Sequence, residues 1–147
     1  MSQFIFRTCK ACGTENRIPA KHLADAGTCG KCKAALSPTA EPVEADPELF
    51  DLVVSSSRVP VFVDFWAAWC GPCRAAAPSV KKVAEDMAGK AVVLKVDTER
   101  YPALAQKYDV QALPTFIVFR GGKVATRQAG LVDHQQMKRW LEPAGVA

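Results

Sequence analysis

The cysteines are the residues best suited to do chemistry in this chain. They form three C-x2-C pairs: Cys9 with Cys12, Cys29 with Cys32, and Cys70 with Cys73. A two-residue spacer lets both sulfurs of a pair bind one metal ion, or form a disulfide bond with each other. The first two pairs lie in a polar N-terminal segment, whereas the third follows the apolar run "VFVDFWAAW". The sequence therefore offers a metal centre and a redox-active dithiol in different parts of the chain.

The four N-terminal cysteines have the spacing of a zinc site. Sixteen residues separate the two pairs Cys9/Cys12 and Cys29/Cys32, which lies in the range of four-cysteine zinc sites. Four thiolates complete a tetrahedron and leave no position for a reacting water, so we expect one structural Zn²⁺ per chain. Gly13 after the first pair allows a tight knuckle, while Lys33 after the second predicts a less regular one.

Metal binding is expected to fold this segment, because residues 1–36 are too few to bury a core. Two disulfide bonds are the alternative use of the four cysteines. The absence of an export signal at the start of the sequence disfavours them, since cysteines in a reducing compartment more often bind metal or react.

The third pair is placed for reactivity. Cys70 stands where an apolar strand gives way to a helix, and the free N–H groups and dipole of a helix start favour a thiolate. This predicts Cys70 as the nucleophile and Cys73, one turn into the helix, as the more buried resolving thiol. Gly71 lets the turn approach closely, and Pro72 fixes the first helical turn without needing an N–H donor.

The elements that position these residues follow from hydrophobic periodicity. We expect helices over residues 47–57, 73–87, 101–110 and 133–142, strands over 60–67 and 91–97, and a hairpin over 114–128 that turns at Gly121 and Gly122. Pro78 is a predicted kink and Asp133 a predicted helix cap. A strand–helix–strand succession implies a parallel crossover unit. The predicted class is therefore α/β, a mixed sheet with helices on both faces.

The chain divides at a segment rich in proline and acidic residues. "SPTAEPVEADPE" predicts an extended, solvated linker over residues 37–48, between a zinc module over 1–36 and a larger domain over 49–147. The net charge of +4 is split between the two ends of the chain with this acidic segment between them. So weak a basic footprint argues against nucleic acid as a partner. No apolar run is long enough to span a bilayer, and we expect a cytoplasmic protein without a membrane role.

The motif "VDFWAAWCGPC", with Pro78 after it and "LPT" around Pro114, resembles the thioredoxin family over residues 49–147. With its four-cysteine N-terminus the whole chain is similar to the bacterial thioredoxin-2 type. The resemblance implies a thioredoxin fold with a small zinc-ribbon-like module, and a monomer that reduces disulfide-containing proteins. It also implies recycling by thioredoxin reductase at the expense of NADPH, with no organic cofactor bound to this chain.

The resemblance also implies roles for single residues. Asp64 matches the buried carboxylate that handles the proton of the resolving Cys73, and its burial in an apolar strand predicts a raised pKa. Lys95 matches the lysine that approaches this aspartate, although an ordinary solvated lysine at a strand end is the alternative. Pro114 matches the family's cis-proline beside the sulfurs, and the backbone of Leu113 is then free to pair with an incoming chain.

The flat substrate-facing rim is carried over in the same way. Trp69 and Gly130 match residues of this rim, which would also include Gly71 and Pro72 between the cysteines.

Two other functions remain open. A disulfide oxidase or isomerase would need an oxidising compartment. Alternatively, the zinc module is a sensing or recruiting element that carries a tethered redox domain.

Overall fold

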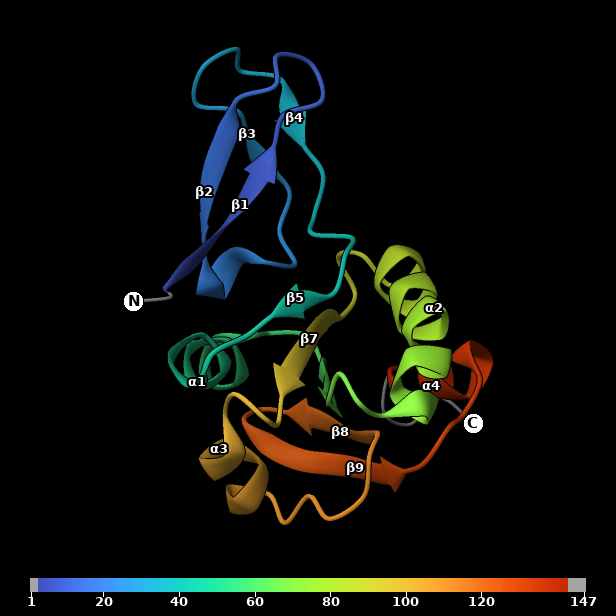
Figure 1. Cartoon of the computed structure of the whole chain (residues 1–147). Helices are drawn as coiled ribbons and strands as arrows, with labels where there is room; N and C mark the ends of the chain where they lie inside the picture. Colours follow the sequence, from blue (N-terminus) through green and yellow to red (C-terminus); the bar gives the residue numbers. More distant parts are fainter. Residues whose placement is uncertain (1–2, 143–147) are drawn as a thin grey trace.

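The computed structural model describes residues 3–142 and shows a small N-terminal module standing on a larger domain (Figure 1). The module contains two short antiparallel hairpins. β1 (Phe4–Thr8) pairs with β2 (Glu15–Pro19), and β3 (Gly27–Thr28) pairs with β4 (Ala35–Leu36). The 3-10 helix η1 (Ala20–His22) follows β2. The two cysteine-bearing loops lie together at the end of the module that points away from the larger domain (Figure 1).

The larger domain is built on a five-stranded mixed sheet in the order β5-β7-β6-β8-β9. β5 (Val43–Glu44), β7 (Val92–Asp97) and β6 (Val61–Trp66) are parallel, whereas β8 (Thr115–Arg120) and β9 (Lys123–Ala129) continue the sheet antiparallel. The helices are α1 (Pro47–Ser56), α2 (Gly71–Asp86), α3 (Pro102–Lys107) and α4 (His134–Trp140). The predicted mixed sheet with helices on both faces is confirmed (Figure 1).

The central strand β6 is buried on both faces, which explains its almost uninterrupted apolar sequence. Val63 faces a core that includes Phe50 of α1 and Leu104 of α3. Phe62 faces a second core with α2 and α4, which also contains Met137. Because side chains alternate along a strand, Asp64 lies on the same face as Phe62, toward α2.

The helix boundaries follow their caps. The carboxylate of Asp46 accepts a hydrogen bond from the N–H of Leu49 at 2.8 Å and starts α1. The predicted cap Asp133 accepts from Gln136 at 2.9 Å and starts α4. Each bond satisfies a donor that the first turn of a helix leaves free. Pro78 lies inside α2 on its exposed side and does not end the helix.

The expected linker over residues 37–48 is extended only as far as residue 46, after which α1 begins, and it is not a free linker. The N–H of Thr39 donates to the carbonyl of Leu23, and the guanidinium of Arg7 donates to the Thr39 hydroxyl at 2.9 Å. Val43 and Glu44 then form β5, at the edge of the sheet. The expected solvated linker is thus replaced by an ordered segment, because backbone pairing with β7 does not depend on apolar side chains.

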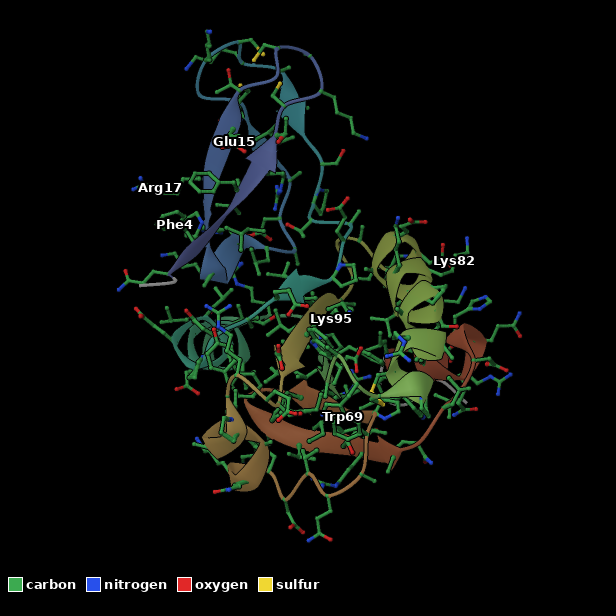
Figure 2. The ribbon with its side chains drawn as sticks, viewed as in Figure 1. Phe4, Glu15, Arg17, Trp69, Lys82 and Lys95 are labelled. Atoms are coloured by element: carbon green, nitrogen blue, oxygen red, sulfur yellow. A yellow bond between two sulfur atoms is a disulfide. The ribbon has the colours of Figure 1, made fainter. Side chains whose placement is uncertain are left out.

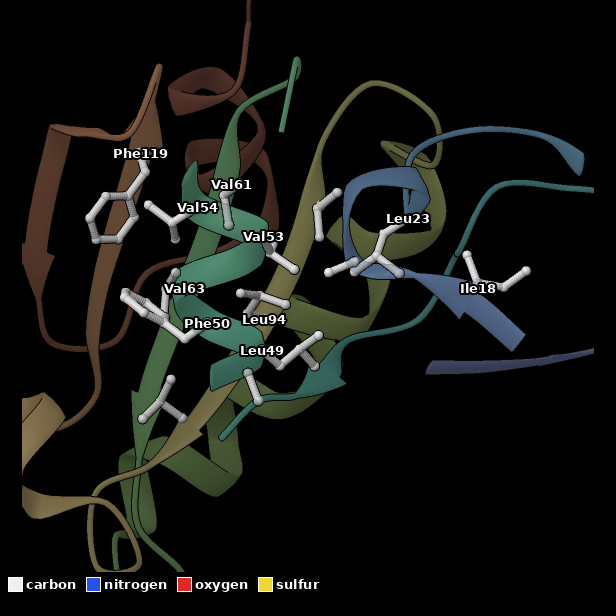
Figure 3. Close-up of a cluster of buried hydrophobic side chains, with 14 of the residues drawn as sticks. Ile18, Leu23, Leu49, Phe50, Val53, Val54, Val61, Val63, Leu94 and Phe119 are labelled. Carbon is white, nitrogen blue, oxygen red and sulfur yellow. The ribbon is translucent and has the colours of Figure 1, made fainter. Parts of the chain in front are cut away.

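The module and the larger domain share one apolar core. Leu23 is 1% exposed and lies in the same cluster as Leu49 and Val53 of α1 (Figure 3). The cluster continues through Leu94 of β7 into the interior of the domain. The position of the module is therefore fixed by buried apolar contacts as well as by the connecting chain.

Among the described residues, no helix has both the length and the apolar character needed to cross a membrane.

Replacing Leu23 by alanine tests the shared core. We expect Leu23→Ala to lower the free energy of unfolding by about 2–4 kcal/mol, because it leaves a cavity between the module and α1. Leu52→Ala on α1 is the matched control, since Leu52 is 37% exposed and should cost less than about 1 kcal/mol. Denaturant unfolding of the metal-loaded proteins measures both values. Equal, small losses would show that the module does not share the core.

Candidate active site and metal centre

Cys70 and Cys73 form a disulfide bond at the start of α2. Cys70 is the N-cap of this helix, and its Sγ accepts a hydrogen bond from the N–H of Cys73 at 3.1 Å. Pro72 lies in the first turn, where its missing N–H costs nothing. The helix therefore directs a backbone donor and the positive end of its dipole at the sulfur of Cys70.

The surroundings of the disulfide are apolar. Cys70 and Cys73 pack with Ala67, and Trp66 and Leu113 lie against them. Cys70 is 3% exposed and Cys73 is 5% exposed. The expectation that Cys73 is the more buried of the two is wrong for this bridged form. Burial does not distinguish the two sulfurs, whereas their positions in the helix do.

The loop before β8 lies beside this pair. The peptide bond between Leu113 and Pro114 is cis, which the sequence could not establish. The carbonyl of Pro114 accepts a hydrogen bond from the N–H of Gly130 at 2.9 Å. Gly130 has φ +96°, a conformation that side chains disfavour. Pro114 and Gly130, predicted from separate parts of the sequence, are thus joined directly.

Trp69 is the most exposed of the large apolar side chains near the disulfide, at 66%. Its indole nitrogen donates to the carboxylate of Glu99 at 2.7 Å. Figure 2 labels Trp69 close to the start of α2. Sequence analysis missed Glu99, and no local pattern could have found it, because the contact joins residues thirty positions apart.

Asp64 lies inside the domain with 1% of its surface exposed, and its Oδ1 atom has no hydrogen-bond partner among the described residues. Burial raises the pKa of Asp64 to about 7; Lys95 acts in the opposite direction and Glu44 adds to the rise. The carboxyl is therefore able to exchange a proton near neutrality, as its sequence context predicts.

Lys95 is half-buried and pairs with Asp64 across β6 and β7. Its Nζ atom lies 4.9 Å from the centre of the Trp66 ring. The structure therefore favours the lysine that approaches the aspartate over a fully solvated lysine at a strand end.

The N-terminal cysteines form the second site, in the loops after β1 and β3 at the end of the module away from the larger domain (Figure 1). The four Sγ atoms lie within 4.8 Å of one another. The Sγ atoms of Cys9 and Cys32 are 3.6 Å apart, and those of Cys12 and Cys29 are 3.7 Å apart. A zinc–sulfur bond of about 2.3 Å places the corners of a tetrahedron about 3.8 Å apart. The spacing of the sulfurs thus fits one tetrahedral metal ion.

The two knuckles have the same backbone shape. The carbonyl of Cys9 accepts from the N–H of Gly13, and the carbonyl of Cys29 accepts from the N–H of Lys33. Gly13 has φ +77° and Lys33 has φ +68°. The predicted irregularity of the second knuckle is therefore wrong, because Lys33 adopts the left-handed conformation that Gly13 adopts without strain.

Asn16 supports the second knuckle from β2. Its side-chain nitrogen lies 3.5 Å from the sulfur of Cys29, and its oxygen accepts from the N–H of Gly30 at 2.9 Å. Backbone N–H groups of the knuckle, together with Asn16, lower the pKa of the Cys29 thiol. Outer partners of this kind orient metal ligands and favour their thiolate form.

Comparison with known proteins identifies the larger domain. Residues 41–143 match the family model described as Thioredoxin. The chain belongs to the thioredoxin family. Residues 8–34 match the model described as Thioredoxin 2, N-terminal, so the resemblance inferred from the sequence is confirmed for both parts. Thioredoxins are thiol–disulfide oxidoreductases, and the Cys70–Cys73 pair is the redox-active motif of this one.

Individual relatives agree with this thioredoxin assignment. Thioredoxin C-3 of Corynebacterium nephridii is 36% identical over 134 residues, which cover 91% of each chain. Thioredoxin 1 of Chlorobaculum tepidum is 41% identical over 92 residues, covering 63% of this chain and 91% of that protein.

Solved structures confirm the thioredoxin fold. A mutant thioredoxin from Halobacterium salinarum is 34% identical and superimposes with a TM-score of 0.65, covering 70% of this chain and 89% of its own. Chloroplastic thioredoxin z is 31% identical, also with a TM-score of 0.65, covering 69% of this chain and 91% of its own.

The raised pKa of Asp64 predicts a pH-dependent effect on stability. Between the unfolded value near 3.8 and the folded value of about 7, only the unfolded state loses this proton, so the wild type is destabilised as the pH rises. Asp64→Asn removes that cost. In the oxidised protein it should stabilise the fold by at most about 4 kcal/mol above pH 7, and by much less at pH 4.

Denaturant unfolding of both proteins from pH 4 to pH 9 measures this difference. A gain that does not change with pH would show that Asp64 titrates normally in the folded state.

Proposed function

We propose that this thioredoxin is a protein-disulfide reductase in which Cys70 attacks and Cys73 resolves. The observation that carries the proposal is the position of the two cysteines at the start of α2. Cys70 caps the helix and receives its N–H donor, while Cys73 lies within the first turn. In the reduced protein this arrangement favours ionisation of Cys70 over Cys73.

The reaction then balances in two steps. The Cys70 thiolate attacks one sulfur of the target disulfide, forming a mixed disulfide and releasing the other target sulfur as a thiolate. Cys73 loses its proton and attacks Cys70, which releases the second target thiolate and leaves the Cys70–Cys73 disulfide. Two electrons pass from the chain to the target. The buried carboxylate of Asp64, on the sheet face toward α2, is the proposed acceptor for the Cys73 proton.

The target chain would bind along the rim around the disulfide. The proposed contacts are Trp69, Gly71, Pro72, Leu113 and Gly130. Trp69, Gly71 and Pro72 are exposed, and Leu113 packs against the cysteines. Pro114, buried beside Leu113 and bonded to Gly130, would fix the backbone that pairs with an extended substrate.

Recycling requires an electron donor outside this chain. Members of the family are reduced by thioredoxin reductase, which uses NADPH, and we propose the same partner here. A reducing compartment such as the cytoplasm suits this direction of electron flow, and the Gly-Pro pair between the cysteines is typical of the reductases of this fold. A disulfide oxidase or isomerase would instead act in an oxidising compartment.

We propose Zn²⁺ as the ion bound by Cys9, Cys12, Cys29 and Cys32. Four thiolates in a tetrahedron are the ligand set of structural zinc, and they leave no position for a substrate or a reactive water. The ion would hold the two knuckles together in a module too small to fold by its own apolar core.

A sensing role for the module is the second candidate. It is favoured by the shared core, in which Leu23 of the module contacts the cluster around Leu49 and Val53. If loss of the metal disorders the module, the packing of Leu23 against α1 in the redox domain changes with it.

Cysteine variants test the proposed reaction. Insulin-disulfide reduction should be lost in both Cys70→Ser and Cys73→Ser, while one zinc ion per chain is retained in each. Only Cys73→Ser should accumulate a mixed disulfide with the substrate, because its nucleophile is intact and its resolving thiol is absent. Retained reduction by Cys70→Ser would reject Cys70 as the nucleophile.

A ligand variant separates the structural and sensing roles. Cys29→Ala should lose the metal and lower the melting temperature, while insulin reduction well below that temperature stays within about twofold of wild type. Gly30→Ala, beside the ligand but with room for a methyl group, is the control that keeps the metal. A several-fold change in the activity of folded Cys29→Ala would contradict a purely structural role and support sensing.

A further inference from the structure

Three charged residues stand side by side on neighbouring strands. In the sheet order β5-β7-β6, Lys95 pairs with Glu44 on one side and with Asp64 on the other. Residues that pair across strands direct their side chains to the same face. One lysine therefore stands between two carboxylates.

This row lies on the sheet face that carries the redox helix. Asp64 also pairs with Phe116, which packs in the same cluster as Ala76 and Val80 of α2. Cys73 is on that helix, one turn before Ala76. The charged row therefore runs along the sheet beneath α2.

Burial falls steadily along the row. Asp64 on the central strand is 1% exposed, Lys95 is half-buried, and Glu44 is the most exposed of the three, though still partly covered, because β5 is the edge strand. Figure 2 labels Lys95 in the body of the domain. The row thus runs from a buried carboxyl on the central strand to the exposed edge of the sheet.

The electrostatics of the row are shared among its members. Partial burial raises the pKa of Glu44. The positive charge of Lys95 and the indole of Trp66 oppose this rise. To a smaller extent, Asp97 adds to the rise and Arg100 opposes it. The charge of Glu44 in turn raises the pKa of Asp64, against the effect of Lys95. On the α2 side, the cluster on this face contains Ala76 and Val80 of the helix, and Trp66, two residues after Asp64 on β6, packs against the cluster of Cys70 and Cys73.

We propose that Glu44 is a positioning residue for the redox reaction: it shares Lys95 with Asp64, leaves the Asp64 carboxylate less fully neutralised, and so makes that carboxylate a stronger base toward the proton that Cys73 gives up. One ammonium group cannot neutralise two carboxylates, so each carboxylate weakens the pairing of the other. This inference rests on the proposed role of Asp64 as proton acceptor. It assigns a function to a residue that the sequence placed in a linker.

The ordered connection to the module gives Glu44 its place. Thr39 is held by Leu23 and Arg7 of the module, and the N–H of Ala45 donates to the carbonyl of Lys95 at 2.9 Å. These bonds lie on both sides of Glu44 and fix it in register with β7.

Titration of the Asp64 carboxyl tests this proposal. Carbon-13 NMR of the full-length, metal-loaded, oxidised protein follows the carboxyl signal against pH, and Asp64→Asn identifies it. We expect Glu44→Gln to lower the midpoint by about half a pH unit. Glu41→Gln, which removes the same charge three residues away and outside the sheet, should leave it unchanged. Lys95→Gln should raise it.

The pH profile of insulin reduction by the pre-reduced protein should move with the midpoint. An Asp64 midpoint in Glu44→Gln at or above the wild-type value would overturn the proposal, as would equal shifts in Glu44→Gln and Glu41→Gln. Either outcome would reject the role of Glu44 only. The proposed function would stand as long as the wild type reduces insulin through Cys70. Conversely, an Asp64→Asn profile identical to the wild type would reject the proton acceptor itself.

Discussion

The active site depends on the way the central strand β6 passes into α2. Because β6 is covered on both faces, its one charged residue, Asp64, is held away from water. A few residues later the chain leaves the sheet and starts a helix at Cys70. A single strand-to-helix connection therefore places a desolvated carboxyl beneath a helix that begins with a thiol. In the proposed reaction, the thiol at the helix start attacks the target, and the buried carboxyl accepts the proton of the resolving Cys73.

The N-terminal module constrains the same domain through other elements, α1 and β5. Its four cysteines gather at one end on a pair of matching knuckles, where a metal ion would replace the core that so short a segment lacks. At the other end, Leu23 is buried against α1. The connecting segment then becomes β5 and brings Glu44 beside Lys95. The module is thus continuous with the sheet that supports the redox site, although its cysteine-bearing loops point away from the larger domain (Figure 1).

Much of this arrangement could be predicted from the sequence, because the decisive signals are local. The apolar run that ends at Cys70, the cap at Asp133 and the spacing of the N-terminal cysteines all depend on residues close together in the chain. β5 was not predicted, because a strand of two residues is too short to show an alternation of apolar and polar residues. Its pairing is decided by β7, which is distant in the sequence. The contact between Trp69 and Glu99 was missed for the same reason. The conformation of Lys33 shows that a backbone hydrogen-bond pattern can override a residue preference.

The central claim is that the start of α2 makes Cys70, and not Cys73, the ionised thiol of the reduced protein. The rate of alkylation by iodoacetamide against pH tests it most directly, with mass spectrometry to identify the modified residue. We predict that Cys70 is alkylated first, with a midpoint below the value of about 8.5 that is usual for a free cysteine. Preferential alkylation of Cys73, or a midpoint for Cys70 at or above that of a free cysteine, would contradict this account.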